Sequence, residues 1–268
     1  MIYLTKDDLK QLEHEKNLKY KYVNLSSGNY HMKCCDQSNM VKELFGKKIA
    51  NIIGLSCPDY QYIPEANCIL SKNIKIDHAF FWAHELGIDG TTLKNIGECL
   101  EFQKANYNRF TNVQEIMFQV YLMHFMDIIF SNIDRSIVNF GFKLNDDNTG
   151  CLTIIDHGEM FDHFNLATQP LSFEKASNLD YTAYSKATEF KCFISKMAPE
   201  LLKVFEQLFL LFEPKKIKYM IEQIEKENNL KLFNKKEILK NYKINYKGLS
   251  KVLEKDMILN RKKQLIKD

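Results

Sequence analysis

The feature that most constrains the fold is a predicted β-hairpin in the middle of the chain. Residues 137–144 and 151–155 are extended apolar segments, and residues 145–150 (Asn-Asp-Asp-Asn-Thr-Gly) form a strong turn sequence between them. The strands of a hairpin are antiparallel, so the start of the first strand lies beside the end of the second. The hairpin therefore predicts that Asn139 and Asp156 lie close together.

Asn139 and Asp156 belong to two short polar motifs that flank this hairpin. Residues 132–141 read Asn-Ile-Asp-Arg-Ser-Ile-Val-Asn-Phe-Gly, and residues 155–158 read Ile-Asp-His-Gly. An acid, an amide five positions later and a second acid after a strand are the side chains that a protein-kinase active site uses. We expect Asp134 to orient the attacking hydroxyl, and Asn139 and Asp156 to hold Mg²⁺ on ATP. Taken alone, an Asp-Arg pair is more often a surface ion pair.

The N-terminal part of the chain reads as a small β-rich unit. Residues 20–35 contain two extended segments separated by turn residues at 26–29, which predicts another hairpin. Apolar residues then recur at helical spacing, with Ser38 as the candidate N-cap and Gly54 as the expected stop. Residues 68–70 read as a short buried strand.

The remainder of the chain is predominantly helical in pattern. Helical patterns begin near residues 111, 198, 214, 235 and 246. We therefore predict an α+β protein with two lobes: a small β-rich N-lobe in residues 1–73 and a larger α-helical C-lobe in residues 74–268.

The central motifs resemble the active-site signature of HipA-like serine/threonine kinases and, more distantly, of phosphoinositide kinases. The resemblance rests on Asn-x-Asp-Arg-x-x-x-Asn-Phe-Gly-Phe at residues 132–142, on Ile-Asp-His-Gly after it, and on Ile-Ile-Gly-Leu at residues 52–55. It implies a two-lobed protein-kinase-like fold, ATP- and Mg²⁺-dependent transfer to a serine or threonine of a protein, and a role as a toxin with an antitoxin partner. The chain departs from the family at Ser136, where histidine is usual.

Two N-lobe residues are candidates for binding the phosphates of ATP. Lys33 ends the second predicted strand and could supply the cation for the α- and β-phosphates, and Glu43 on the next helix could pair with it. Both interpretations rest on chain order and element type. The alternatives are that Lys33 is a solvated strand-edge lysine and that Glu43 forms a helix-surface pair with Lys47.

The loop over the phosphates and the hinge beside the adenine complete the predicted ATP site. The loop is expected at Ser26, Ser27 and Gly28, where backbone N–H groups could act as donors, although a single glycine is fewer than such loops usually contain. The hinge is expected at Leu70, Ser71 and Asn73. The HipA-like resemblance also implies that Ser26 and Ser27 are autophosphorylation sites.

These motifs favour a kinase but leave its acceptor open. A phosphoinositide or other small-molecule kinase would share the same signature, and a nucleotide-binding pseudokinase scaffold would fit Ser136 and the sparse loop. Direct nucleic-acid binding is disfavoured because 37 basic and 34 acidic residues leave a formal charge of only +3.

Composition and the N-terminal sequence indicate where the protein resides. No apolar run approaches the length of a bilayer span, and the first residues lack a signal-peptide pattern. The seven cysteines include no Cys-x-x-Cys pair, so reduced thiols are expected. We expect a cytoplasmic protein with no membrane span, and export as an effector stays open.

Overall fold

The structure, a computed structural model, describes residues 2–15, 20–78, 93–132, 135, 139–161 and 199–264. These residues form a mixed α+β protein with two antiparallel sheets and several long helices. The predicted α+β class is confirmed.

The N-terminal sheet has the strand order β1-β2-β4-β3, and all neighbouring strands are antiparallel. Its strands are β1 (Tyr20–Leu25), β2 (Gly28–Lys33), β3 (Gln61–Ile63) and β4 (Cys68–Lys72). β1 and β2 form the predicted hairpin, with Leu25 opposite Gly28 at the turn.

The two faces of this sheet have different neighbours because successive side chains of a strand point to opposite faces. One face packs against α1 (Lys6–Glu15), which the sequence patterns did not predict. The small core between them comprises Leu12, Val23, Leu25, Tyr30, Met32, Ile63, Ala66, Cys68 and Leu70. The intervening residues of β2 and β4, among them His31, Lys33 and Ser71, lie on the other face, which lines a cavity.

The helix α2 (Gln37–Ile52) follows the sheet's second strand. Its N-cap is Asp36, whose carboxylate accepts a hydrogen bond from the backbone N–H of Asn39 at 2.9 Å. The prediction of Ser38 as N-cap was therefore wrong by two residues, because an aspartate just upstream reaches the same orphan donors. Gly54 has φ +78°, the left-handed conformation expected at a helix C-terminus.

The second sheet contains the predicted central hairpin. Its order is β5-β6-β7, with β5 (Asp77–His78), β6 (Phe140–Leu144) and β7 (Gly150–Ile154). Phe140 pairs with Ile154, so residues 139 and 155 follow as neighbours: the N–H of Ile155 donates to the carbonyl of Asn139 at 3.0 Å.

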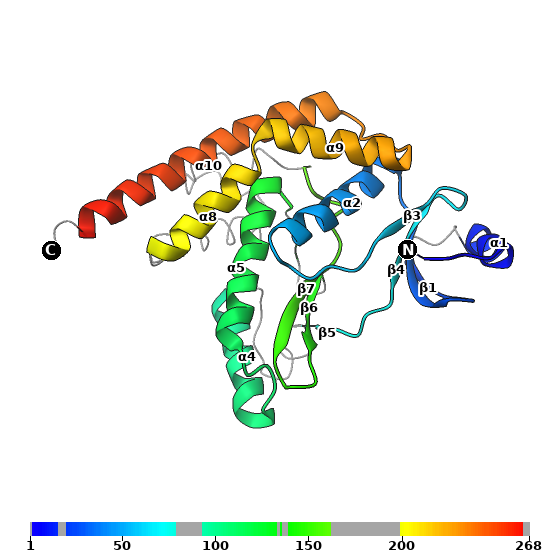
Figure 1. Ribbon diagram of the computed structural model, residues 1–268, viewed down its shortest axis with the longest axis horizontal. Helices are drawn as coiled ribbons and strands as arrows, with labels where there is room; N and C mark the ends of the chain where they lie inside the picture. Colours follow the sequence, from blue (N-terminus) through cyan, green and yellow to red (C-terminus); the bar gives the residue numbers. More distant parts are fainter. Residues whose placement is uncertain are drawn as a thin grey trace, which may run out of the picture.

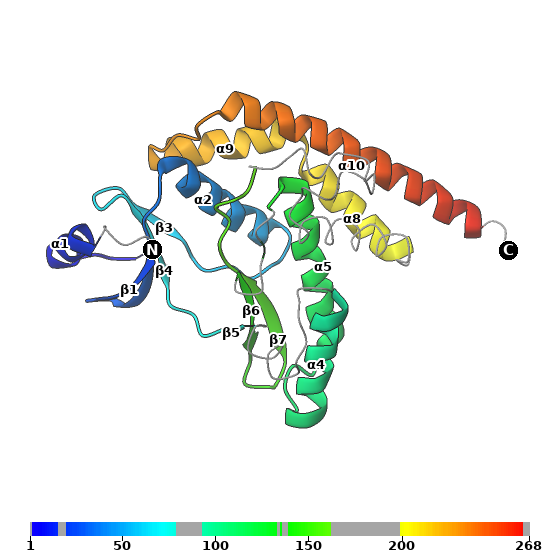
Figure 2. The same ribbon diagram turned by 180° about the vertical axis from the view of Figure 1, so that it is seen from behind.

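Helices form the rest of the described chain: α4 (Leu93–Tyr107), α5 (Val113–Phe130), α8 (Pro199–Leu211), α9 (Pro214–Asn228) and α10 (Lys235–Gln264). Figure 1 shows α5 beside the second sheet, and α9 with α10 crossing above α2; Figure 2 gives the same arrangement from behind. The long α5 is buried along most of its length.

Separate helices predicted near residues 235 and 246 are one continuous helix, α10. Packing explains the continuity. The Tyr242 hydroxyl donates to the carbonyl of Phe212 at 2.6 Å, and the Asn245 amide donates to the carbonyl of Ile129 at 2.9 Å. Tertiary contacts on α8 and α5 therefore hold the segment that sequence propensity left ambiguous.

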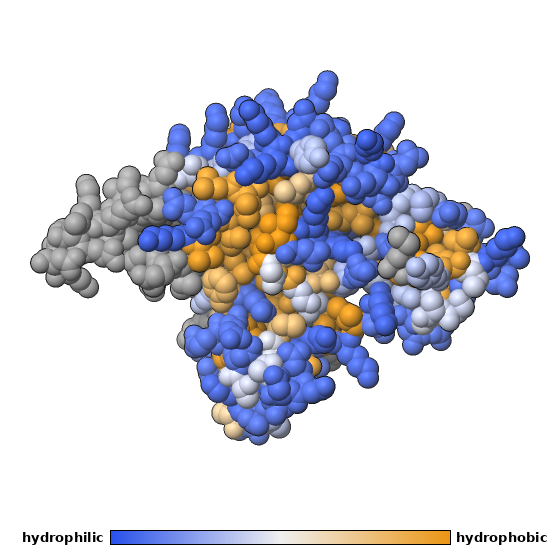
Figure 3. All heavy atoms as spheres, in the orientation of Figure 1, coloured by the Kyte–Doolittle hydropathy of each residue, from blue (hydrophilic) through white to orange (hydrophobic). Residues whose placement is uncertain are grey.

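The surface is mostly polar over the C-terminal helices. Figure 3 shows hydrophilic side chains gathered over α9 and α10, while α9 buries Ile217, Ile221 and Ile224 underneath. Among the described helices, none combines the length and apolar character needed to cross a bilayer.

Candidate active site

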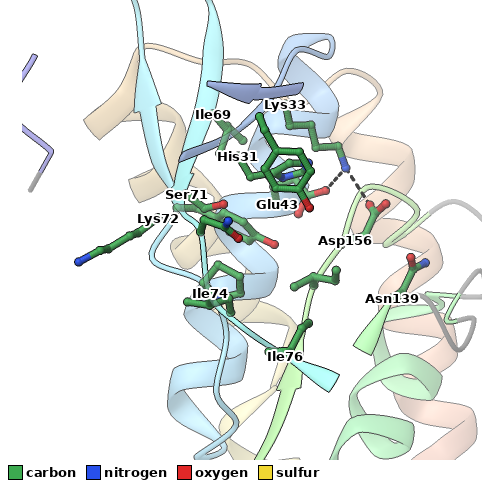
Figure 4. A pocket seen from close by; sticks show the side chains of 15 residues that line it. His31, Lys33, Glu43, Ile69, Ser71, Lys72, Ile74, Ile76, Asn139 and Asp156 are labelled. Atoms are coloured by element: carbon green, nitrogen blue, oxygen red, sulfur yellow. Dashed lines mark hydrogen bonds and ion pairs between the residues drawn. The ribbon is translucent and has the colours of Figure 1, made fainter. Parts of the chain in front are cut away.

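A cavity of about 240 Å³ lies between the N-terminal sheet and the central hairpin of β6 and β7. This volume is somewhat smaller than that of typical small-molecule sites, which is roughly 300–1,000 Å³. Residues from both parts of the chain converge on it, as Figure 4 shows. The lining comprises Tyr22, His31, Lys33, Glu43, Pro58, Tyr60, Ile69, Ser71, Lys72, Asn73, Ile74, Ile76, Asn139, Ile155 and Asp156.

Lys33 bridges two carboxylates in this cavity. Its Nζ forms an ion pair with Glu43 from α2 and donates to Oδ1 of Asp156 at 2.7 Å. Burial by itself would lower the pKa of Lys33, but the charges of Glu43 and Asp156 outweigh it and hold that pKa above its ordinary value. Lys33 is therefore a permanently charged cation at neutral pH.

Glu43 connects α2 to the segment that follows β7. Its other carboxylate oxygen accepts a hydrogen bond from the backbone N–H of His157 at 3.0 Å. Burial raises the pKa of Glu43 in spite of the adjacent Lys33, so this carboxylate depends on its ion pair to remain charged. The two oxygens of Glu43 thus fix both the lysine and the backbone next to Asp156.

Asp156 and Asn139 both line the cavity, at the open end of the central hairpin. Asp156 has φ +56°, an uncommon left-handed conformation for a residue other than glycine. Burial would raise the pKa of Asp156, but the neighbouring Lys33 ammonium holds it below its ordinary value. A charged carboxylate and an amide oxygen are hard ligands, which suit Mg²⁺.

The donor set fits a magnesium site that is only partly built from protein. Within the described residues, no group of three or more His, Cys, Asp or Glu side chains could hold a metal ion. Mg²⁺ commonly takes one or two protein ligands and completes its shell with water and substrate phosphates. Asn139 and Asp156 match that requirement.

Arg135 joins the segments that carry Asn139 and Asp156. Its guanidinium is fully buried and donates to the Asp127 carboxylate, with Nε–Oδ2 at 3.1 Å. It also donates to the backbone carbonyl of Asn139 at 3.0 Å and to those of Ile155 and Asp156. Asp127 was missed by the sequence interpretation; an acid near the end of a predominantly apolar helix was the available signal.

His157 is a packing residue rather than a cavity residue. It is fully buried, and Nη2 of Arg135 lies 3.2 Å from its Nδ1. Since arginine only donates, Nδ1 accepts and the proton of the neutral ring is on Nε2, which lies 3.5 Å from Sγ of Cys57. Burial and the Arg135 charge hold the pKa of His157 well below its ordinary value.

The predicted phosphate loop, Ser26 to Gly28, does not line this cavity. Ser26 is bound by Asp8 of α1, whose carboxylate accepts from the Ser26 N–H at 2.8 Å and from its hydroxyl at 2.5 Å. The described residues that line the cavity do not include Ser26, Ser27 or Gly28. The Ser26 amide is therefore committed within the protein, a contact that sequence reasoning missed because α1 was not predicted.

The predicted hinge residues divide between the two faces of β4. Ser71 and Asn73 line the cavity, whereas Leu70 is buried in the core against α1. The Asn73 N–H donates to the carbonyl of Asn29 at 3.1 Å, so it continues the β2–β4 pairing. Asp134, the predicted catalytic acid, and Ser136 lie outside the described residues.

Similarity to known proteins was found by comparing structures and not by comparing sequences. No protein-family model and no curated protein sequence matches the chain. Among solved structures, the chain is similar to the Helicobacter pylori proinflammatory kinase CtkA, with a TM-score of 0.56 and 14% sequence identity over 91% of this chain and 95% of that one. The chain has a two-lobed, kinase-like fold. At this level of identity the similarity shows the fold, and the cavity lies between its lobes.

Proposed function

We propose that the protein is an ATP- and Mg²⁺-dependent kinase of the HipA-like type that phosphorylates serine or threonine hydroxyls of a protein. The observation that carries this proposal is the position of Lys33 between Glu43 and Asp156 in a cavity that Asn139 also lines. One cation, one carboxylate and one amide on a shared cavity are what phosphoryl transfer requires of a protein.

In the proposed reaction Lys33 binds the α- and β-phosphates and Glu43 keeps its ammonium in place. Asn139 and Asp156 would hold Mg²⁺, which neutralises charge on the β- and γ-phosphates when bound. Asp134 would accept a hydrogen bond from the acceptor hydroxyl and aim it at the γ-phosphate. Arg135 positions the backbone of both metal-binding residues without contacting the substrate.

The test is incubation of the purified chain with γ-labelled ATP, Mg²⁺ and a mixture of protein substrates. Lys33→Met and Asp156→Asn should each lower label transfer by at least about 100-fold, because each removes charge that the transition state needs. Lys218→Met is the matched control and should retain activity, because Lys218 is an exposed lysine on α9 and is not in the cavity lining of the described residues. Equal transfer by the wild type and Asp156→Asn would refute the proposal.

The same assay shows whether the acceptor of the phosphoryl group is a protein or a lipid. Lipid vesicles containing phosphoinositides, together with protein substrates, separate the protein kinase from the phosphoinositide or small-molecule alternative. Label found only in lipid would overturn the protein acceptor. Mass spectrometry of the chain after reaction would locate any autophosphorylation, for which Ser26 and Ser27 are the proposed positions.

A nucleotide-binding pseudokinase is the second candidate, and one observation favours it. Both the N–H and the hydroxyl of Ser26 are bound by Asp8, so this amide of the β1–β2 turn does not point to a phosphate-binding role. ATP binding that depends on Lys33, together with equal and near-zero turnover by the wild type and Asp134→Ala, would support this candidate over the enzyme.

The toxin role with an antitoxin partner is proposed from the HipA-like resemblance. Its test is to measure the growth of cells after expression of the protein has been induced in them. Toxicity that disappears with Asp156→Ala, at matched protein levels, would support it. Equal toxicity of both forms would show that phosphoryl transfer is not the cause.

A further inference from the structure

Exposed lysines form a row along one face of the helix α10. Each lysine follows the previous one by three or four residues, a spacing that places them on the same face of an α-helix. At a rise of 1.5 Å per residue the row extends over about 22 Å. We call this row the lysine stripe, and its members are Lys236, Lys240, Lys243, Lys247 and Lys251.

The lysine stripe faces away from the core of the protein. On the other side of α10, the buried Tyr242 and Asn245 donate hydrogen bonds to the carbonyls of Phe212 and Ile129. Figures 1 and 2 show α10 along the outer edge of the molecule, and Figure 3 shows hydrophilic side chains gathered over it. An extended partner can therefore contact all five lysines at once.

The positive charge of the stripe is not balanced by nearby acids. In residues 235–251 the sequence contains one acid, Glu237. None of the five lysines forms an ion pair with another residue that the structure describes, whereas Lys235, beside the stripe, pairs with Glu225 of α9. Like charges three or four residues apart destabilise a helix. An anionic partner would relieve this repulsion.

Exposed apolar side chains accompany the stripe. Ile244 is 53% exposed and lies four residues after Lys240 and three before Lys247, so it neighbours both on the helix surface. Phe233, three residues before the first lysine of the stripe, is 56% exposed. An anionic bilayer uses both features, because lysines meet its headgroups while apolar side chains enter the acyl boundary. A nucleic-acid backbone would use the lysines alone.

We propose that the lysine stripe docks the protein on the surface of a bilayer that contains anionic phospholipids. The inference goes beyond the proposed kinase function and does not depend on it. Charges act over only about 8 Å at physiological ionic strength, so the stripe determines binding and the formal net charge of +3 contributes little. Each lysine near an anionic surface contributes roughly fivefold to the affinity.

The test is sedimentation of the full chain with vesicles of phosphatidylcholine, with and without phosphatidylglycerol. We expect binding only where phosphatidylglycerol is present, and we expect added salt to weaken it. The triple variant Lys240→Gln, Lys243→Gln and Lys247→Gln should weaken binding by about 100-fold. Ile244→Gln should weaken it by about fivefold, because the apolar side chain no longer enters the bilayer.

The matched control changes the net charge by the same amount at distant positions. It is the triple variant Lys10→Gln, Lys104→Gln and Lys143→Gln, whose lysines are exposed on α1, α4 and β6. Its binding should stay within about threefold of the wild type, because these lysines lie away from the stripe. Circular dichroism melting checks that each variant is folded.

Three outcomes would overturn the inference. The first is absence of wild-type binding to vesicles that contain phosphatidylglycerol. The second is equal weakening by the two triple variants, since net charge and not the stripe would then cause the binding. The third is binding of poly(U) RNA that only the α10 variant loses, without binding to vesicles, which would assign the stripe to nucleic acid.

Discussion

Asp127 and Arg135 form a fully buried ion pair beneath the candidate active site. The Nε and Nη2 groups of Arg135 donate to the Asp127 carboxylate at 3.1–3.3 Å. Asn132 also donates to Asp127, at 2.9 Å. The C-terminal end of α5 is thereby joined to Arg135, which also donates to the backbone carbonyls of Asn139 and Asp156. The backbone at these two cavity residues therefore depends on a buried ion pair that lies outside the cavity lining.

Removing one partner of this pair should be strongly destabilising. Arg135→Met leaves the Asp127 carboxylate buried without its cation, and we expect the free energy of unfolding in urea to fall by about 3–5 kcal/mol. Lys218→Met is the control, because Lys218 pairs with Glu222 on the exposed surface of α9 and should cost under ~1 kcal/mol. A loss no larger in Arg135→Met than in Lys218→Met would contradict the structural role.

Gly46 on α2 provides the space that His157 occupies. A Cβ added at Gly46 would overlap Cγ of His157, so the ring or the helix must move. We expect Gly46→Ala to destabilise the protein by about 1–3 kcal/mol in urea unfolding and to impair the proposed ATP binding, since Glu43 lies on the same helix.

Gly97→Ala on α4 is the matched control for Gly46→Ala. A Cβ at Gly97 would meet the end of Met117 at 3.7 Å, an ordinary contact. Alanine is the better helix former, so this variant should be neutral or stabilised by up to ~1 kcal/mol. Similar losses in both variants would show that close packing against His157 is not the cause.

Acidification should destabilise the protein through His157. Its folded pKa is depressed by burial and by Arg135, so below the unfolded pKa, about 6.5, the unfolded chain takes up a proton that the folded chain excludes. Stability is therefore present above about pH 6.5 and falls as the pH decreases, by up to ~1.4 kcal/mol per pH unit from this residue. The burial of His31, with the Lys33 charge, lowers the pKa of His31 and acts in the same direction.

The measurement for His157 is urea unfolding at about pH 7.5 and pH 5.5. His157→Gln should lose less stability between these two values than the wild type, with the remaining difference due to His31 and other groups. Identical pH dependence in the two proteins would mean that the pKa of His157 is the same in the folded and unfolded states, and would contradict the prediction.

Asp8 should hold the β1–β2 turn to α1. Its carboxylate accepts from the N–H and hydroxyl groups of both Thr5 and Ser26. Asp8→Asn should lower stability by about 1–3 kcal/mol and make the turn more sensitive to limited proteolysis. Asp7→Asn, one residue away with a 93% exposed side chain, should behave as the wild type. Unchanged cleavage at the turn in Asp8→Asn would argue against the anchor.

Much of the fold follows from local patterns in the sequence. The β1–β2 hairpin and the central hairpin could be predicted because turn residues separate short extended segments. Helix α9 begins at Pro214, a favoured first-turn residue. The N-cap at Asp36 and the continuity of α10 could not be predicted as readily, since neighbouring acids compete for one cap and packing overrides propensity.

The candidate site was only partly accessible from sequence. Chain order suggested that Lys33 pairs with Glu43, and the structure brings these two side chains into contact. The contact of Lys33 with Asp156 was not predicted, and the roles of all three residues in ATP binding stay predictions. The contributions of Asp8 and Asp127 could not be foreseen because each depends on contacts that no local pattern specifies. The lobe boundary near residue 73 also stays a prediction.

The contact between Lys33 and Asp156 joins residues 123 positions apart in the chain. Closing so long a loop is entropically costly and slow compared with forming the local Lys33–Glu43 pair. During synthesis, a growing chain that ends before the central hairpin contains Lys33 but not Asp156. Lys33 therefore gains its second acidic partner only after residue 156 has been synthesised.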